Sequence, residues 1–581
     1  MSTASQWLLL LRVHARMAGV KATHSVKNAR LMTATILLFL LAYTLSAYWL
    51  FSEGLAYVAR LPGAGALLSD RLIYVMFFCF MMMLIFSVAV TSYISLYRNR
   101  DTRWLLTLPI SHRTIFLWKC FESAMFSGWG LIFILFPLLL AFAQIRDVPF
   151  GFFLKVLFVL IPFLILASTL GSLILVTAVR FLSRRQILFV TALVGLILVA
   201  SAIQTALLNR EVIQKEELSS AFTFQRVLHH TNISVNRALP STWLSGAIIN
   251  WTRPYRHFGN FLYPTLLFSN ALMGLMLVHR AGGAWFYRSW NRSLQHSAYS
   301  AIRRESYHNA PSVEQFVKKR TTNPLIRALI GRPNAAISRK DFLTFFRDPA
   351  QWVQFSLVFG LLAIYASGLR QMNGNIDMPK DLYLVAFLNL AVCALALSTL
   401  TTRFVFPQFS LEGRKLWILA MSPLKLSSLV IQKFVTSTLF SGFIIVMILL
   451  IGGYNLQLGW ADSLFFAFAI GFLAIGLNAL AVGLGVIFPN LEESNAAKIV
   501  SGFGGTLCLI GSFIYILLFI LLLAWARWDV FQSNEINSNW LYNPQSQAAI
   551  AGALFINTVV SVVPLIFSQK KLKRLEIISN L

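Results

Sequence analysis

Long apolar runs recur along the whole chain and are separated by shorter polar stretches. A helix of about 20 apolar residues crosses the roughly 30 Å hydrocarbon core of a bilayer. No sustained alternation of apolar and polar residues, the mark of membrane strands, is present. The pattern predicts an all-α polytopic membrane protein with about twelve transmembrane helices, at 32–52, 72–97, 123–144, 156–179, 187–208, 260–279, 350–369, 382–402, 434–454, 463–488, 499–526 and 547–568.

A polar-then-amphipathic stretch between these runs occurs twice. The segment 410–426 resembles 97–114, with Trp417 matching Trp104 and Pro423 matching Pro109. Lys433 then matches Lys119, and a Ser-Gly pair follows in both copies. A duplication in one orientation predicts two parallel six-helix repeats. We expect three regions: a first transmembrane domain at 1–280, a basic linker at 281–333 and a second transmembrane domain at 334–581.

The distribution of charge gives the expected topology. The net charge is +28, yet only 12% of the residues are charged. With the N-terminus inside, about 36 of the 49 Lys and Arg residues fall on the cytoplasmic side. Basic residues favour the cytoplasmic face of membrane proteins. We therefore expect both termini in the cytoplasm, a location in the plasma (bacterial inner) membrane, and contact with lipid rather than nucleic acid.

Familiar catalytic and binding motifs are absent from the sequence. It contains no Gly-Lys pair, so it has no Gly-x4-Gly-Lys phosphate loop. No His, Cys, Asp or Glu cluster has metal-ligand spacing, and no Asp, Glu, Lys or Arg lies in the middle of a predicted span. Asn478 and Asn557 are uncharged exceptions, read as interhelical hydrogen bonds rather than substrate ligands. We therefore expect no catalytic residue, metal or cofactor in this chain.

Each repeated stretch is predicted to be a helix–Pro–helix element on the cytoplasmic face. In the first copy (98–122), Asp101 is expected to cap a short helix that ends at Pro109, and Ser111 to cap the next helix. The second copy (408–433) starts at Ser410 or Glu412 and closes at Pro423. Such an element could transmit a push from a docked partner. The alternative is a pair of ordinary positive-inside loops.

A second cytoplasmic signal precedes the seventh span. In 335–349, Phe342, Leu343 and Phe346 could lie in the membrane interface while basic residues reach headgroups or a partner. A surface anchor without a partner explains the segment equally well. Residues 7–18 form a similar amphipathic stretch in the first half, with Trp7 and Leu11 on one face.

The segments RKDFLTFFRDP and EGRKLWILAMSPL, followed by Lys433, resemble the permease subunits of ABC-2 type ATP-binding-cassette exporters. The resemblance implies a connecting helix at 335–349, coupling elements at 98–122 and 408–433, and two docked copies of a separate ABC ATPase that holds ATP and Mg. The implied docking residues are Asp101, Arg103, Trp104, Pro109, Ser111, Lys119, Glu412, Gly413, Arg414, Trp417, Pro423 and Lys433. Those of the connecting helix are Arg339, Lys340, Asp341, Arg347 and Asp348.

The two copies differ at the acidic turn, where Asn99-Arg100 stands in place of Glu412-Gly413. We therefore expect unequal docking sites. The resulting hypothesis is a non-enzymatic permease subunit of an exporter with an unknown substrate. Two alternatives are a 6+6 secondary transporter, which would need coupling charges in its spans, and a membrane scaffold that transports nothing.

Overall fold

The computed structural model describes residues 3–28, 30–60, 65–181, 232–253, 259–292, 332–347, parts of 351–369, 379–415, 426–491, 496–533 and 542–579. Throughout these ranges the chain is helical apart from short turns, and they contain no strand. The all-helical prediction is confirmed for this part of the chain.

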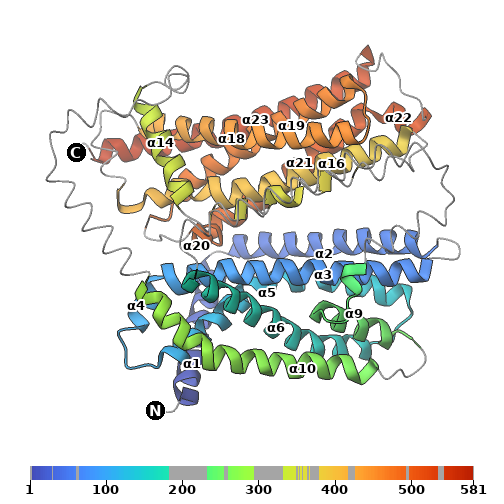
Figure 1. Cartoon of the computed structure of the whole chain (residues 1–581). Helices are drawn as coiled ribbons and strands as arrows, with labels where there is room; N and C mark the ends of the chain where they lie inside the picture. The colour runs from blue at the N-terminus through green and yellow to red at the C-terminus, as the bar shows by residue number, and fades with distance from the viewer. Residues whose placement is uncertain are drawn as a thin grey trace. The chain divides into compact units, whose positions relative to one another are not determined.

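The described residues divide into two units (Figure 1). Unit 1 holds those between 3 and 292. Its elements are α1 (Thr3–Asn28), α2 (Arg30–Ala59), α3 (Gly65–Tyr93), η1 (Ile94–Arg98), α4 (Arg100–Leu105), α5 (His112–Ile145), α6 (Gly151–Phe181), η2 (Asn232–Val235), α9 (Pro240–Trp251), α10 (Gly259–Leu277) and η3 (Val278–Gly282). Residues 283–292, the first part of the predicted linker, are helical and pack in unit 1 through buried Phe286 and Trp290. The predicted domain boundaries stay predictions.

Unit 2 holds the described residues between 332 and 579. Its elements are α14 (Arg332–Arg347), α16 (Pro379–Leu400), η4 (Thr401–Val405), η5 (Phe406–Gln408), η6 (Ser410–Lys415), α18 (Leu426–Asn455), α19 (Trp460–Ile487), α20 (Ala496–Val500), α21 (Phe503–Ala526), α22 (Trp528–Ser533) and α23 (Pro544–Ser579). The C-terminus lies at the end of this unit that carries α14, and α22 lies at the other end (Figure 1).

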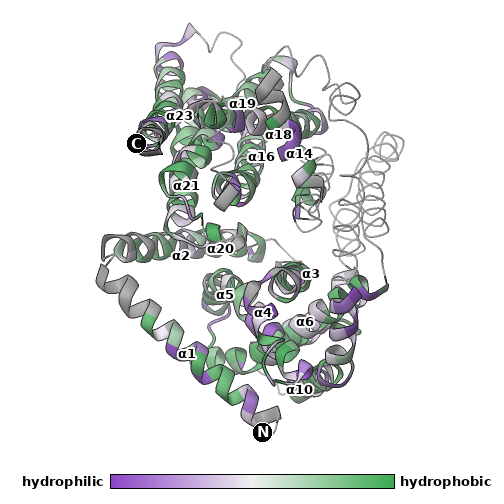
Figure 2. Ribbon diagram, turned by 90° about the vertical axis from the view of Figure 1, so that its left-hand side faces the viewer, coloured by the Kyte–Doolittle hydropathy of each residue, from purple (hydrophilic) through white to green (hydrophobic). Residues whose placement is uncertain are grey.

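Nine helices in the described ranges are long and apolar enough to cross a membrane, or ten if a bent pair within 112–145 counts as one span. Figure 2 colours most of their length as hydrophobic and also shows a hydrophilic stretch on α14. This supports a membrane protein. The expected span at 187–208 lies outside the described residues, and the one at 350–369 lies partly outside them. The count of twelve and the two-repeat layout stay predictions.

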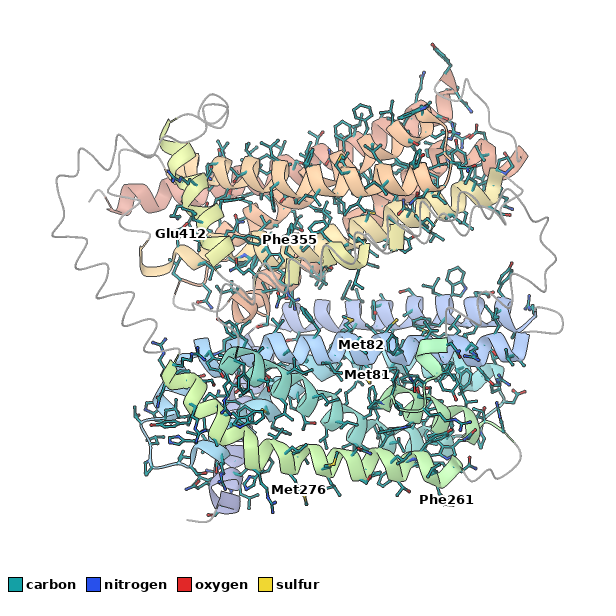
Figure 3. The ribbon with its side chains drawn as sticks, viewed as in Figure 1. Met81, Met82, Phe261, Met276, Phe355 and Glu412 are labelled. Atoms are coloured by element: carbon teal, nitrogen blue, oxygen red, sulfur yellow. The ribbon has the colours of Figure 1, made fainter. Side chains whose placement is uncertain are left out.

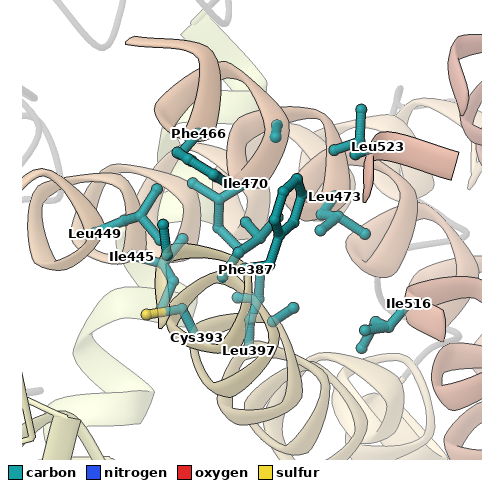
Figure 4. Close-up of a cluster of buried hydrophobic side chains, with 14 of the residues drawn as sticks. Phe387, Cys393, Leu397, Ile445, Leu449, Phe466, Ile470, Leu473, Ile516 and Leu523 are labelled. Carbon is teal, nitrogen blue, oxygen red and sulfur yellow. The ribbon is translucent and has the colours of Figure 1, made fainter. Parts of the chain in front are cut away.

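Each unit has its own apolar core. In unit 2, Phe387, Phe466, Ile470 and Leu473 point toward one another between α16 and α19 (Figure 4). In unit 1, side chains of α3, α5, α6 and α9 form the corresponding cluster, and Met81 of α3 belongs to it (Figure 3). These cores hold the membrane helices together, so that the polar elements at the helix ends have fixed supports.

Polar contacts also link helices inside the apolar cores. Asn478 of α19 donates to Ser441 Oγ of α18 at 3.0 Å, and Tyr515 of α21 donates to Asn557 Oδ1 of α23 at 2.8 Å. The prediction that both asparagines make interhelical hydrogen bonds is confirmed. At the α22 end of unit 2, buried Arg527 bonds the Tyr383 hydroxyl and pairs with Asp462 at 3.4 Å.

Candidate functional site

The first coupling element (98–122) contains one short helix and the start of a long one. Helix α4 is capped by Asn99, whose Oδ1 accepts from the Asp101 N–H at 3.1 Å. The prediction that Asp101 is the cap is therefore wrong; Asp101 lies in the first turn. An Asn side chain two residues upstream reaches that orphan N–H directly. Trp104 is 62% exposed, and Arg103 and Pro109 are exposed too.

The predicted cap at Ser111 is confirmed. Ser111 Oγ accepts from the Thr114 N–H at 3.2 Å, and α5 starts at the next residue. Gln6 of α1 also enters this cap, because its Oε1 accepts from the Ser111 N–H at 3.3 Å and from Thr114 Oγ1 at 3.2 Å. Trp7 packs edge-on against Trp118 of α5, with 6.2 Å between ring centroids. The N-terminal helix is therefore attached to the start of α5.

Lys119 is fully buried about two turns after the Ser111 cap in α5. Its Nζ lies 2.6 Å from Glu122 Oε2, which is also 3.4 Å from Ser95 Oγ of η1. A buried ammonium without a partner is costly, so Glu122 supplies the counter-charge. Because Lys119 and Glu122 are three residues apart on one helix, this ion pair connects α5 mainly to itself.

The second coupling element (408–433) has a different backbone. Helix α16 continues through η4 and η5 into η6, where Gly413 adopts φ 53° and ψ −137°. Only glycine takes this conformation without strain. Ser410 Oγ, which is buried, accepts from the Asn490 N–H at 3.1 Å. The predicted positions Trp417 and Pro423 lie outside the described residues, as does the side chain of Arg414.

Four charged side chains from three elements meet beside η6. We call them the four-charge cluster: Lys340 and Asp341 of α14, Glu412 of η6 and Lys433 of α18. Glu412 Oε1 lies 2.6 Å from Lys340 Nζ and 3.0 Å from Lys433 Nζ. Lys433 Nζ is also 3.2 Å from Asp341 Oδ2, and Lys340 Nζ is 3.4 Å from Asp341 Oδ1. Two cations and two anions therefore neutralise one another (Glu412 is labelled in Figure 3).

Lys433 is the centre of this cluster. Its side chain is only 3% exposed, whereas Glu412 is 13%, Asp341 26% and Lys340 43% exposed. Charge-assisted contacts are stronger away from water than at the surface, where ion pairs contribute little. The contacts of Lys433 therefore dominate, and they join α18 to both η6 and α14.

The inner face of α14 makes further contacts with the rest of unit 2. Ser338 Oγ accepts from Gln432 Nε2 at 2.8 Å, and Ile337 is buried. Phe345 packs against Phe355, with 5.5 Å between centroids, and Figure 3 labels Phe355 beside this helix. Outward, Phe342 is 55% and Leu343 40% exposed, and Arg339 is exposed as well. The side chain of Arg347 and all of Asp348 lie outside the described residues.

Several residues that shape these elements were missed from the sequence. Glu122 supplies the counter-charge to Lys119 and was not predicted. Asp341 supplies a counter-charge to Lys433 and was predicted as part of the connecting helix. Glu122 could have been found, because it follows Lys119 by three residues, a spacing that brings helix side chains together. Gln6, Ser338 and Gln432 carry no local signal, since the partners in these contacts lie 94 or more residues away. The docking roles assigned to the other residues stay predictions.

The geometry of the second coupling element suits mechanical connection between helices. In the four-charge cluster the charged groups are paired with one another, and the described residues contain no group of three His, Cys, Asp or Glu side chains that could hold a metal. In unit 2 the contacts join a surface helix, an irregular turn and a membrane helix. Displacing any one of these elements would therefore strain the other two.

Comparison with known proteins gives one family. A family described as "Putative ATP-binding cassette" matches residues 25–577. No curated protein matches the chain. No solved structure matches it either.

This match overturns the resemblance to ABC-2 type exporter permeases, because the family is described as an ATP-binding cassette and not as a permease. The hypothesis of a separate, non-enzymatic permease subunit is wrong for the same reason. So is the expectation that ATP and Mg are held only by a partner, because the family description implies nucleotide binding in this chain.

The residues described by the structure do not fit a nucleotide held by a phosphate loop. Such a loop uses a strand-to-helix turn whose backbone N–H groups and lysine hold the phosphates. The described ranges contain no strand, and the sequence has no Gly-Lys pair. The family description thus names a ligand whose usual binding loop this chain lacks. Since the match extends over nearly the whole length, the chain belongs to the putative ATP-binding cassette family.

Proposed function

We propose that this chain works in ATP-dependent transport at a membrane, as an integral membrane member of its ATP-binding-cassette family. Two findings support the proposal: the family match over 25–577 and at least nine membrane-length helices in the described ranges. A chain with so many apolar helices is suited to moving a solute or lipid across a bilayer or to opening a path for one. The transported substrate is not part of the proposal.

The observation that carries the mechanical part of this proposal is the four-charge cluster. It links α14 and η6, two elements at one end of unit 2, to α18, a candidate span that begins at Ser427. Lys433 acts as a positioning residue, because its buried ammonium holds the other two elements through Glu412 and Asp341. Movement of η6 or α14 caused by nucleotide binding would thus be passed to the start of α18.

Finer features of the proposal come from the charge distribution. The protein would lie in the plasma (bacterial inner) membrane, with both termini in the cytoplasm. The layout would be twelve spans in two parallel repeats. Arg339 on α14 and the exposed Trp104 on α4 would then face the cytoplasm.

The surfaces of the two coupling elements are also proposed to contact ATPase copies, one at each element. Trp104 offers an exposed aromatic side chain with Arg103 and Asp101 beside it. Exposed aromatic and arginine side chains are frequent anchors of protein interfaces. This contact is compatible with nucleotide binding by the chain itself, since partner and ligand can be measured separately.

The test combines nucleotide binding with hydrogen–deuterium exchange. The chain is reconstituted in nanodiscs, first alone and then with any ATPase that co-purifies, and exposed to ATP and Mg. We expect nucleotide to change amide exchange in α14 and η6. The variant Lys433→Met should reduce that change, while α9, which has no part in either element, serves as the internal control.

The proposal would fail if ATP altered exchange in neither α14 nor η6 in the chain alone or in the complex. Photo-crosslinking with azido-ATP then assigns the nucleotide. Labelling of the purified chain alone supports binding by this chain, and labelling confined to a co-purified protein assigns the nucleotide to that partner.

A further inference from the structure

Two arginines lie together where α6 ends in unit 1. Arg180 lies in the last turn of α6, and its guanidinium is 4.9 Å from the ring centroid of Phe181 and 5.1 Å from that of Trp285. Arg292, from the helix at 283–292, donates to the Arg180 carbonyl oxygen at 2.7 Å. This contact ties the Arg292 side chain to the end of α6 that carries Arg180.

No acidic side chain pairs with either arginine among the described residues. The Arg180 guanidinium contacts two aromatic rings, and the Arg292 guanidinium contacts a backbone carbonyl oxygen. In this respect they differ from Arg146 of the same unit, which pairs with Asp70 at 2.6 Å. Two arginines at one helix end without a carboxylate partner make this end positive, and the aromatic contacts of Arg180 restrict its side chain.

The surroundings of this arginine pair are those of a membrane interface. Arg180 and Phe181 end a candidate span, Gly151–Phe181, and Phe181 is 60% exposed. Trp285 lies next to them and is partly exposed. Arginine with aromatic side chains at the end of a span is typical of the headgroup region. Planar guanidiniums bind phosphate oxygens in a bidentate manner.

We propose that Arg180 and Arg292 together bind the phosphate of an anionic phospholipid headgroup at this end of unit 1. The acyl chains would lie along the exposed apolar surface of α6, next to Phe181. This inference is independent of the transport proposal, because it concerns lipid contact and involves neither coupling element.

Native mass spectrometry of the delipidated full chain, titrated with phosphatidylglycerol or phosphatidylcholine, tests this site. The variant Arg180→Gln/Arg292→Gln should lose one tightly bound phosphatidylglycerol, with about a tenfold or greater fall in apparent affinity. The matched control is Lys155→Gln/Arg237→Gln, which removes the same charge from exposed residues near the other end of α6 and before α9. That control should bind phosphatidylglycerol like the unmodified chain.

The single variant Arg180→Gln keeps the Arg292 contact, because that contact uses a backbone carbonyl. It tests the site even if the double variant does not fold, and it should also weaken phosphatidylglycerol binding. Equal binding by the Arg180→Gln variant and the unmodified chain would overturn the proposal. Binding of phosphatidylcholine as tightly as phosphatidylglycerol would also overturn it. Displacement of the lipid by millimolar inorganic phosphate would overturn it too, because that result would indicate a site for free phosphate.

Discussion

Each unit has a buried lysine near the start of a long apolar helix, and the two lysines are neutralised by carboxylates from different places. In unit 1, Lys119 is neutralised by Glu122 on its own helix. In unit 2, Lys433 is neutralised by Glu412 and Asp341, which come from two other elements. The carboxylate therefore occupies a different position in each copy. Thr436 of unit 2 stands at the position that Glu122 has in unit 1, and Asn99 of unit 1 stands at the position that Glu412 has in unit 2.

This difference shows how the position of one carboxylate determines which elements move together. An ion pair within α5 leaves α4 and α1 attached through neutral contacts, such as the Gln6 contacts with the Ser111 cap. An ion-pair network between α18, η6 and α14 ties three elements with charge-assisted contacts. We therefore expect α14, η6 and α18 to move together more closely than α1, α4 and α5 do.

Removing the buried cation should have the largest effect. Lys433→Met leaves Glu412 and Asp341 facing each other with only the half-exposed Lys340, and should lower the free energy of unfolding by about 3 kcal/mol. Lys119→Met leaves only Glu122, which is 19% exposed and can hydrate, so its cost should be about 1.5 kcal/mol. Unfolding of both variants by sodium dodecyl sulfate measures the two losses in the free energy of unfolding. Equal losses would contradict the distinction between the units.

Moving the carboxylate should convert one arrangement into the other. Glu412→Asn gives unit 2 the residue found in unit 1 and should cost about 2 kcal/mol, because Lys433 keeps only Asp341. Adding Thr436→Glu restores an i, i+3 partner and should recover about half of that loss. The control Thr436→Gln has the same size without the charge and should recover nothing. Recovery by the control would show that charge is not the cause.

The backbone of η6 gives a smaller effect. Gly413→Ala forces a side chain into φ 53° and brings its Cβ to 3.3 Å from the Leu491 carbonyl oxygen, so we expect a loss of about 1–2 kcal/mol. Gly471→Ala, in α19 with nothing within 4 Å of the added Cβ, is the matched control. It should be neutral or slightly stabilising, because alanine favours a helix. Similar losses for both would remove the special role of Gly413.

The smallest effect is expected at the exposed edge of the cluster. Lys340→Ala removes a 43% exposed cation and should cost about 0.5 kcal/mol, with a further decrease at high salt. Arg339→Ala, next to it on α14 and exposed, should cost less. A loss at Lys340 as large as that of Lys433 would mean that the outer pair, rather than the buried one, holds α14.

Local patterns predicted much of this architecture, and distant contacts account for what they missed. Apolar runs located the candidate spans seen in the described ranges, because a span must be apolar along its length. Ser111 was recognisable as a cap from its position before α5. The cap at Asn99 was missed because Asp101 is an equally good cap by residue type, and only backbone geometry decides between them. The four-charge cluster joins residues 21 and 92 positions apart, so no local pattern brings its members together.

The family assignment teaches a related lesson. Short motifs such as EGRKLWILAMSPL directed the interpretation to permeases, whereas the match over 25–577 gives a family described as an ATP-binding cassette. A few short segments are therefore a weaker guide to the family than a match along the chain.

Hydrogen–deuterium exchange of α14 in the Glu412→Asn/Thr436→Glu variant tests the central claim most directly. In this variant Lys433 has a partner on its own helix, as Lys119 does, while η6 has lost its carboxylate. We predict that amides at 332–347 exchange at least about tenfold faster than in the unmodified chain, while those at the start of α18 keep their protection. Unchanged protection of α14 would contradict the claim that the four-charge cluster binds these three elements into one body.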